Sequence, residues 1–111
     1  MNSITFEEMQ QIQKELQAKY GKGSNWGALT PEHGVKTLLW MINECGEVAD
    51  VLKKESEEAV MEDPEICRHF IEEMCDVLMY FNDLMLCFQI TPEELTEQYW
   101  KKHHYNMNRW E

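Results

Sequence analysis

The stretch LLWMINECGEVADVL at residues 38–52 decides the fold of this chain. Its apolar residues recur at steps of four and three, which places them on one helical face and is typical of a helix-bundle core. These residues are Leu38, Ile42, Cys45, Ala49 and Leu52. The stretch FIEEMCDVLMYFNDLMLCF at residues 70–88 carries a matching series, Phe70, Met74, Val77, Phe81, Leu84 and Phe88. Two such helices with a short connection pack antiparallel, so the sequence predicts an all-α helix bundle.

Helix start signals extend this interpretation to the rest of the chain. Thr5 and Thr91 are each followed three residues later by a Glu, the pattern of a capping box. Pro follows Thr30, Asp63 and Thr91, where it suits the first position of a helix. These signals predict four helices, at about 5–19, 31–58, 64–89 and 92–108. The sequence has no alternating strand pattern, and we expect one domain, 1–111.

The composition excludes several classes of partner. The chain has 10 Lys+Arg against 21 Asp+Glu, a net charge of −11, which argues against binding to nucleic acid or to an anionic membrane surface. The sequence has no apolar run long enough to span a bilayer, no signal-peptide pattern at its start, and no CxxC pair among its four cysteines. We therefore expect a cytoplasmic protein with reduced thiols.

The two central segments carry more apolar residues than one stripe each. The additional residues are Trp40, Met41, Val48, Val51, Leu78, Met79 and Met85. A monomer of four helices leaves part of this surface exposed, so the sequence predicts self-association.

Two pairs of carboxylates interrupt these apolar segments. Glu44 and Glu47 are three residues apart, as are Glu73 and Asp76, so each pair lies on one face of its helix. The neighbours on those faces are apolar or aromatic, namely Trp40, Val51, Ile66 and Tyr80.

No Lys or Arg lies within residues 40–51 or 70–89 to neutralise these carboxylates. Charges in such surroundings are costly unless they are paired or bind a metal. Oxygen ligands select Mg²⁺ or Mn²⁺ over zinc, so the pattern indicates a site for a hard divalent cation. The alternative is that the acids lie on the solvated edge of a bundle. Asp50 is a further ligand, an outer acceptor or the ion-pair partner of Lys53 or Lys54.

The last helix carries the second informative cluster. Lys102, Asn106 and Arg109 step by four and three, so a helix aligns them on one face, where they suit phosphate oxygens. The alternative is that they are only favourable cations at a helix C-terminus. Trp26 and His33 are candidates for contact with a nucleobase, although a tryptophan in a loop more often covers the core.

The two acidic motifs, Glu44-Cys-Gly-Glu47 and Glu73-Met-Cys-Asp76, resemble the ExxE…ExxD signature of MazG-like nucleotide pyrophosphohydrolases, which belong to the all-α NTP pyrophosphatase superfamily. The segment from Lys102 to Arg109 resembles the KxxxNxxR element of that family. The likeness runs from about Trp26 to Trp110.

The resemblance implies a four-helix subunit that assembles as a dimer or tetramer, with active sites near the subunit interfaces. The four acids of the two motifs would be catalytic and would bind Mg²⁺, with Mn²⁺ as a possible substitute. The reaction would convert a nucleoside triphosphate, in particular a deoxynucleotide, to the monophosphate and pyrophosphate. Its role would be clean-up of the nucleotide pool. The phosphates would be contacted by Tyr80, Lys102, Asn106 and Arg109, and the base by Trp26 and His33.

Other functions are compatible with a helical, acidic chain. A non-catalytic oligomerisation module or a nucleotide-binding module would keep the helices without turnover. A di-iron carboxylate bundle is disfavoured, because that class uses Glu-x-x-His and the sequence contains none.

Overall fold

The computed structural model describes residues 1–20 and 28–110, and the regular secondary structure of this part of the chain is all helical, with no strand. This confirms the prediction of an all-α fold. Five α-helices and a short 3₁₀ helix follow one another: α1 Phe6–Tyr20, η1 Pro31–His33, α2 Gly34–Lys54, α3 Glu57–Glu62, α4 Pro64–Cys87 and α5 Pro92–Asn108.

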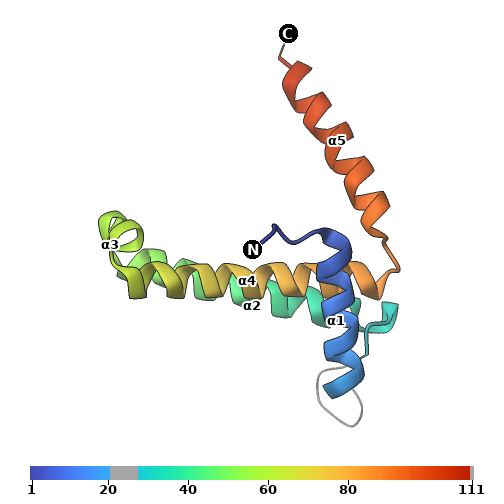
Figure 1. The fold of residues 1–111 in the computed structure, drawn as a ribbon, viewed down its shortest axis with the longest axis horizontal. Helices are drawn as coiled ribbons and strands as arrows, with labels where there is room; N and C mark the ends of the chain where they lie inside the picture. Colours follow the sequence, from blue (N-terminus) through green and yellow to red (C-terminus); the bar gives the residue numbers. More distant parts are fainter. Residues whose placement is uncertain (21–27, 111) are drawn as a thin grey trace.

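The central element is an antiparallel pair formed by α2 and α4, as predicted (Figure 1). The short helix α3 packs on α4 at one end of the pair, and α1 crosses α4 toward the other end. Helix α5 turns away from the pair and projects from it, contacting mainly α1 (Figure 1). None of the described helices is long and apolar enough to cross a membrane.

The starts of α1, α4 and α5 make the capping hydrogen bonds that the sequence predicts. Thr91 and Glu94 form a complete capping box, in which the Glu94 backbone N–H donates to the Thr91 hydroxyl and the Thr91 backbone N–H donates to the Glu94 carboxylate. Thr5 and Glu8 make the same reciprocal pair at α1. The Asp63 carboxylate accepts from two backbone N–H groups at the start of α4.

The prediction of one helix over 31–58 was wrong at both ends. A 3₁₀ turn precedes α2, and α2 ends at Lys54. The chain becomes extended at Glu55, with φ −111° and ψ 150°, and Ser56 starts a new helix by accepting from the Ala59 N–H. A serine that caps competes with continuation of the helix, which explains the break. Helix α4 likewise ends at Cys87, before Gln89 takes a positive φ of 58°.

The face of α2 that packs on α4 also differs from the prediction. In the single chain, Leu38, Ile42 and Leu52 are 38%, 54% and 53% exposed, and Cys45 and Ala49 are exposed too. Apart from Trp40, the buried or half-buried residues of α2 form a neighbouring series with the same three-and-four spacing: Gly34, Thr37, Met41, Glu44, Val48 and Val51. Two adjacent faces of α2 therefore follow the bundle pattern, and α4 packs on the one that includes Glu44.

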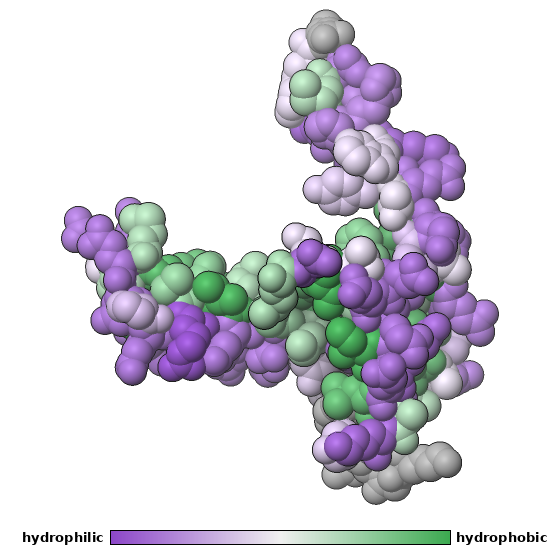
Figure 2. Space-filling model, in the orientation of Figure 1, coloured by the Kyte–Doolittle hydropathy of each residue, from purple (hydrophilic) through white to green (hydrophobic). Residues whose placement is uncertain are grey.

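The series predicted on the partner helix is mostly covered. Phe70, Val77, Phe81 and Leu84 are half-buried, whereas Met74 and Phe88 are 46% and 50% exposed. Figure 2 shows hydrophobic surface along α4, on the side of the angle that α4 makes with α5. The exposed apolar residues of α4 are Ile71, Met74, Leu78 and Met79.

Close contacts fix the two ends of this arrangement. A Cβ at Gly34 would lie within 2.6 Å of Cε2 of Phe88, so the start of α2 meets the end of α4 only because residue 34 is a glycine. Gln13 of α1 donates from Nε2 to Asp83 Oδ1 of α4 at 2.8 Å, and Gln10 donates to the Ile90 carbonyl at 3.2 Å. These side-chain bonds hold α1 across α4 and next to the start of α5.

Candidate metal centre

Three of the four predicted metal ligands come together between α2 and α4. Glu44, Glu73 and Asp76 each offer a carboxylate oxygen, and these three oxygens all lie within 4.8 Å of one another. Glu44 is on the face of α2 that packs on α4, and the Glu73 side chain is only 17% exposed. We refer to these three residues as the acidic cluster. Their spacing allows one divalent cation to contact all three carboxylates.

The electrostatics of the cluster agree with that geometry. Burial, followed by the negative charges of Asp76, Glu73 and Glu47, raises the pKa of Glu44 above its ordinary value. The nearest basic side chain in the ion pairs of the described residues is His69, whose Nδ1 lies 3.8 Å from Glu73 Oε1. Like charges held together without a cation favour protonation or metal binding. The donor set consists of oxygen atoms only, which fits Mg²⁺ or Mn²⁺.

Glu47, the fourth predicted ligand, lies beside the cluster rather than within it. Its charge acts on Glu44, but its carboxylate is not part of the group of three. Glu47 and Asp50 line a groove that also includes Lys54, Arg68 and His69. Glu47 thus lies at the edge of the cluster, and both acids share a groove with the cationic side chains of Lys54 and Arg68.

Tyr80 lies next to the cluster on α4, as its place in the sequence predicts. Its ring packs against Trp40 of α2, with centroids 6.0 Å apart and planes inclined at 54°. Burial, and then the charges of Glu44, Asp83 and Asp76, raise the pKa of the Tyr80 hydroxyl. The hydroxyl therefore stays protonated at neutral pH and can donate a hydrogen bond.

A pocket of about 140 Å³ opens between α1, α2 and α4 beside this aromatic pair. Its walls include Trp40, Tyr80 and Asp76, which connects the pocket to the acidic cluster. Asp83 and Gln13 also line it and are hydrogen-bonded to each other. Neither Asp83 nor Gln13 was predicted from the sequence to belong to a site. The available signal was Asp83, a charge inside the apolar segment of α4; nothing in the sequence pointed to Gln13.

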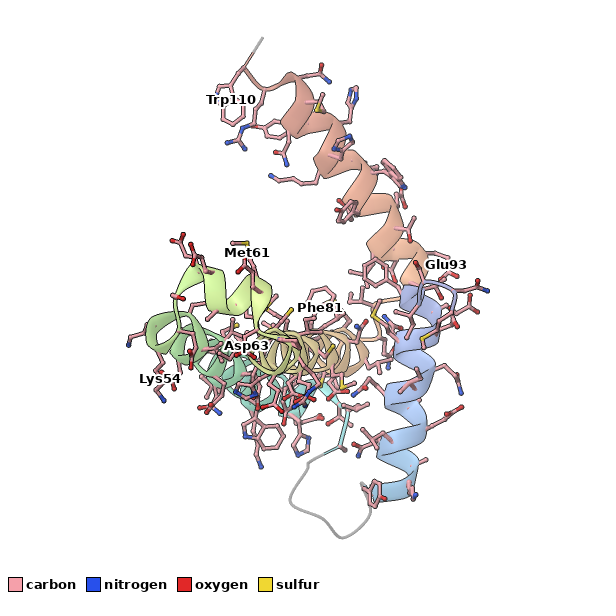
Figure 3. All side chains as sticks on the ribbon, turned by 60° about the vertical axis from the view of Figure 1, so that its left-hand side comes forward. Lys54, Met61, Asp63, Phe81, Glu93 and Trp110 are labelled. Carbon is pink, nitrogen blue, oxygen red and sulfur yellow. The ribbon has the colours of Figure 1, made fainter. Side chains whose placement is uncertain are left out.

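The cationic cluster of α5 lies away from the acidic cluster in the single chain. Lys102, Asn106 and Arg109 are all exposed on the projecting helix (Figure 1). Figure 3 shows that Trp110, just after the end of α5, lies far from Phe81 of α4 and from Asp63, which caps the start of α4. The Lys102 ammonium sits 4.9 Å from the centroid of its own Tyr105 ring, and the Arg109 guanidinium 3.9 Å from that of Trp110. One chain therefore does not bring these cations to the carboxylates.

Of the two residues predicted to contact a base, the structure describes only His33. His33 ends the 3₁₀ turn before α2, where its Nδ1 is 2.9 Å from the Thr30 hydroxyl and its carbonyl accepts from the Thr37 hydroxyl. Thr37 lines the pocket, whereas His33 is not among its lining residues. Trp26 lies outside the described residues.

No protein-family model, curated protein or solved structure matches this chain.

Proposed function

We propose that this protein is a Mg²⁺-dependent nucleoside triphosphate pyrophosphohydrolase, which cleaves a (d)NTP to the (d)NMP and pyrophosphate. The observation that carries the proposal is the position of the acidic cluster beside a pocket walled by Trp40 and Tyr80. A nucleotide needs both parts: a metal site for its phosphates and an aromatic surface for its base. The motif resemblance supports the same reaction.

Glu44, Glu73 and Asp76 would hold the cation, with Glu47 as a further ligand or as a carboxylate that orients water. When bound, Mg²⁺ neutralises the phosphate charge and activates water for attack on the α-phosphorus. The protonated Tyr80 hydroxyl donates to a phosphate oxygen, and the Trp40 and Tyr80 rings contact the base. Lys102 and Arg109 would neutralise the remaining phosphate charge, and the Asn106 amide would donate a hydrogen bond to a phosphate oxygen. Cytoplasmic clean-up of the nucleotide pool, by a dimer or tetramer of this chain, is the biological role that the proposal implies.

The test measures pyrophosphate release from a panel of standard and modified NTPs and dNTPs, with Mg²⁺ and with EDTA. We expect release of equal amounts of pyrophosphate and monophosphate that EDTA abolishes. The Glu73→Gln variant should lose turnover by about a hundredfold or more, since even residues that only support metal ligands are worth ~10–100-fold. Glu72→Gln is the matched control, because Glu72 is an exposed neighbour that pairs with Arg68 at 2.8 Å.

Turnover that survives EDTA, or equal losses in both variants, would contradict the metal-site assignment. If folded protein hydrolyses nothing in the panel, the second candidate is favoured instead. That candidate is a non-catalytic helical oligomerisation or nucleotide-binding module, and the exposed apolar residues of α2 are the observation that supports it. Titration of the inactive protein with Mg²⁺ and a nucleotide distinguishes the two modules, because only the nucleotide-binding module would bind the nucleotide.

A further inference from the structure

The pocket beside the acidic cluster contains two polar side chains that the proposed chemistry does not use. Gln13 of α1 and Asp83 of α4 line it where α1 crosses α4 (Figure 1), and the Gln13 Nε2 donates to Asp83 Oδ1 at 2.8 Å. Gln13 is 5% exposed, and Asp83 is half-buried. A few polar groups of this kind in a mainly apolar pocket fix the orientation of a ligand and give specificity.

Helix α4 arranges the pocket in the order of the parts of a nucleotide. Asp76 of the acidic cluster, Tyr80 and Asp83 are four and three residues apart, so they lie on one face of the helix. At a rise of 1.5 Å per residue, Asp83 lies about 10 Å along α4 from Asp76. A nucleotide whose phosphates reach a cation at Asp76 thus has its base beside Tyr80 and the outer edge of that base near Gln13 and Asp83.

The size of the pocket limits the kind of base. Its volume is about 140 Å³. An apolar cavity of about 150 Å³ holds one benzene ring, so this pocket accommodates one six-membered ring. The single ring of a pyrimidine fits this space, whereas the two fused rings of a purine exceed it.

The hydrogen bond between Gln13 and Asp83 sets the direction of the amide. A carboxylate only accepts hydrogen bonds, so the NH₂ end of the Gln13 amide faces Asp83. Among residues 1–20 and 28–110, this is the only hydrogen bond that either side chain makes. The second N–H of Gln13 and the second oxygen of Asp83 are therefore available to a ligand, and they present a donor next to an acceptor.

Cytosine is the pyrimidine with the matching edge. Its exocyclic amino group is a donor, and the adjacent ring nitrogen N3 is an acceptor. Uracil and thymine have the reverse pattern, an acceptor oxygen next to an N–H donor. Uracil in this pocket would place its oxygen against the Asp83 carboxylate. A site built from hydrogen-bonding groups rejects a mismatched analogue by up to about 10⁴–10⁵-fold.

We infer that Gln13 and Asp83 recognise the base, and that the substrate class is a cytosine nucleotide. The Asp83 carboxylate accepts from the amino group, the Gln13 amide donates to N3, and the ring lies against Trp40 and Tyr80. Gln13 and Asp83 determine specificity and take no part in the chemical step. The inference rests on the proposed function for the reaction, whereas selective binding of the base does not require turnover.

Calorimetric titration of the full-length protein with α,β-imido analogues of dCTP, dUTP and dATP tests this inference, because these analogues cannot release pyrophosphate. The titrations contain Mg²⁺ and are made at pH 8, a pH that favours the charged form of Asp83. We expect the dCTP analogue to bind at least about a hundredfold more tightly than the other two. Equal affinities, a preference for another analogue, or no binding at all would overturn the inference.

The Asp83→Asn variant distinguishes recognition of the base from a structural role. The new amide can donate to the uracil oxygen, and the Gln13 amide can turn and accept from the N–H of uracil. The ratio of dCTP-analogue to dUTP-analogue affinity should therefore fall by about a hundredfold or more. Damage to the fold would weaken both analogues alike, so an unchanged ratio would contradict the inference.

Two glutamines of α1 provide a matched pair of variants. Gln13→Leu removes the donor to N3, so the same ratio should fall by about tenfold, the usual effect of one lost hydrogen bond in a buried site. Gln11→Leu should leave the ratio unchanged, because Gln11 is exposed and bonds to Glu15 of its own helix at 3.3 Å. Equal changes in both variants would contradict recognition by Gln13.

Failure of this inference and failure of the proposed function give different results. A protein that releases pyrophosphate equally from dCTP, dUTP and dATP keeps the proposed reaction and refutes the cytosine preference. A protein that binds the dCTP analogue selectively and hydrolyses none of the three nucleotides supports recognition by Gln13 and Asp83 and refutes the proposed reaction.

Discussion

The α2–α4 pair and helix α5 are both regular helical elements, yet they are held in different ways. The pair is fixed by contacts between distant parts of the sequence, including the fit of Phe88 against Gly34 and the hydrogen bond between Thr37 and Cys87. Helix α5 is fixed by its own first turn, through the capping box of Thr91 and Glu94, and by its contact with α1.

The carboxylates and the cations of the candidate site lie on these two different parts of the structure. The carboxylates lie on the rigid pair, where partial burial raises the pKa of Glu44. The cations lie on the projecting helix, where each is exposed. A substitution on the pair should therefore change both stability and the site, whereas a substitution on α5 should change the site and leave the fold of the pair intact.

The largest effect that separates the two regions is expected at Lys102. Lys102→Ala should reduce nucleotide turnover by about a hundredfold, the usual effect of removing one donor that stabilises developing charge. The thermal midpoint should stay unchanged, because Lys102 is exposed at the surface of the single chain. Turnover assays and thermal melts of Lys102→Ala and Lys101→Ala, measured side by side, check this. A drop in thermal midpoint at Lys102 alone would mean that α5 is part of the cooperative core.

Next in size is the effect of overpacking the pair at Gly34. Gly34→Ala should reduce the free energy of unfolding by about 1–3 kcal/mol, because the new methyl group meets the Phe88 ring. Gly46→Ala on the same helix is the matched control, since a Cβ there meets nothing within 4 Å. It should stabilise the helix by about 0.5–1 kcal/mol. Denaturant melts measure both, and a destabilising Gly46→Ala would indicate that another molecule covers this face of α2.

A smaller and strictly local effect is expected at the start of α5. Thr91→Ala removes the hydroxyl that accepts from the Glu94 N–H, and should weaken the helix by about 1 kcal/mol. Amide hydrogen exchange should accelerate along α5 and stay unchanged in α4. Thr96→Ala, an exposed position inside the same helix, is the control. Equal acceleration in α4 would show that the two helices unfold as one unit.

The smallest effect concerns Asp83, where α1 meets the pair. Burial raises the pKa of Asp83, and the hydrogen bond from Gln13 opposes that rise. The native state therefore binds the Asp83 proton more tightly than the unfolded state does. The resulting contribution to the free energy of unfolding is fully present below the ordinary pKa of an aspartate, and it is lost as the pH rises through the raised pKa. Asp83→Asn should flatten this slope in denaturant melts between about pH 4 and 7.

Gln13→Leu should instead make the slope of stability against pH steeper, because it removes the hydrogen bond that favours the charged form of Asp83. A slope that neither variant alters would assign the pH dependence to Glu44, whose pKa is raised as well.

Local signals in the sequence predicted most of the fold. Capping boxes and the Asp63-Pro64 pair depend on residues within three positions of each other, and the structure confirms each of them. The choice between two faces of α2 does not depend on local chemistry. The stripe from Leu38 to Leu52 is the more apolar one, yet α4 packs on the face with Gly34, Thr37 and Glu44, where Phe88 can approach the backbone.

In the candidate site too, the sequence predicted the features that depend on spacing within one helix and not those that depend on how two helices pack. Spacing within one helix predicted that Glu73 and Asp76 share a face, and the structure places both beside Glu44. It could not predict that Glu47 lies at the edge of the cluster, because that depends on how α2 is rotated against α4. The pair of Gln13 and Asp83 joins positions 70 residues apart in the sequence, so no pattern in the sequence could reveal it.

The turn between α4 and α5 determines the direction in which α5 projects from the α2–α4 pair. Only residues 88–91 separate the two helices, and Gln89 there has a positive φ of 58°. One residue inserted in a helix rotates everything after it by about 100° and shifts it by about 1.5 Å. A single insertion in the last turn of α4, just before these residues, would thus redirect α5 as a whole and leave the acidic cluster untouched. A change at this point would therefore give α5 a different neighbour while the carboxylates of the acidic cluster stay in place.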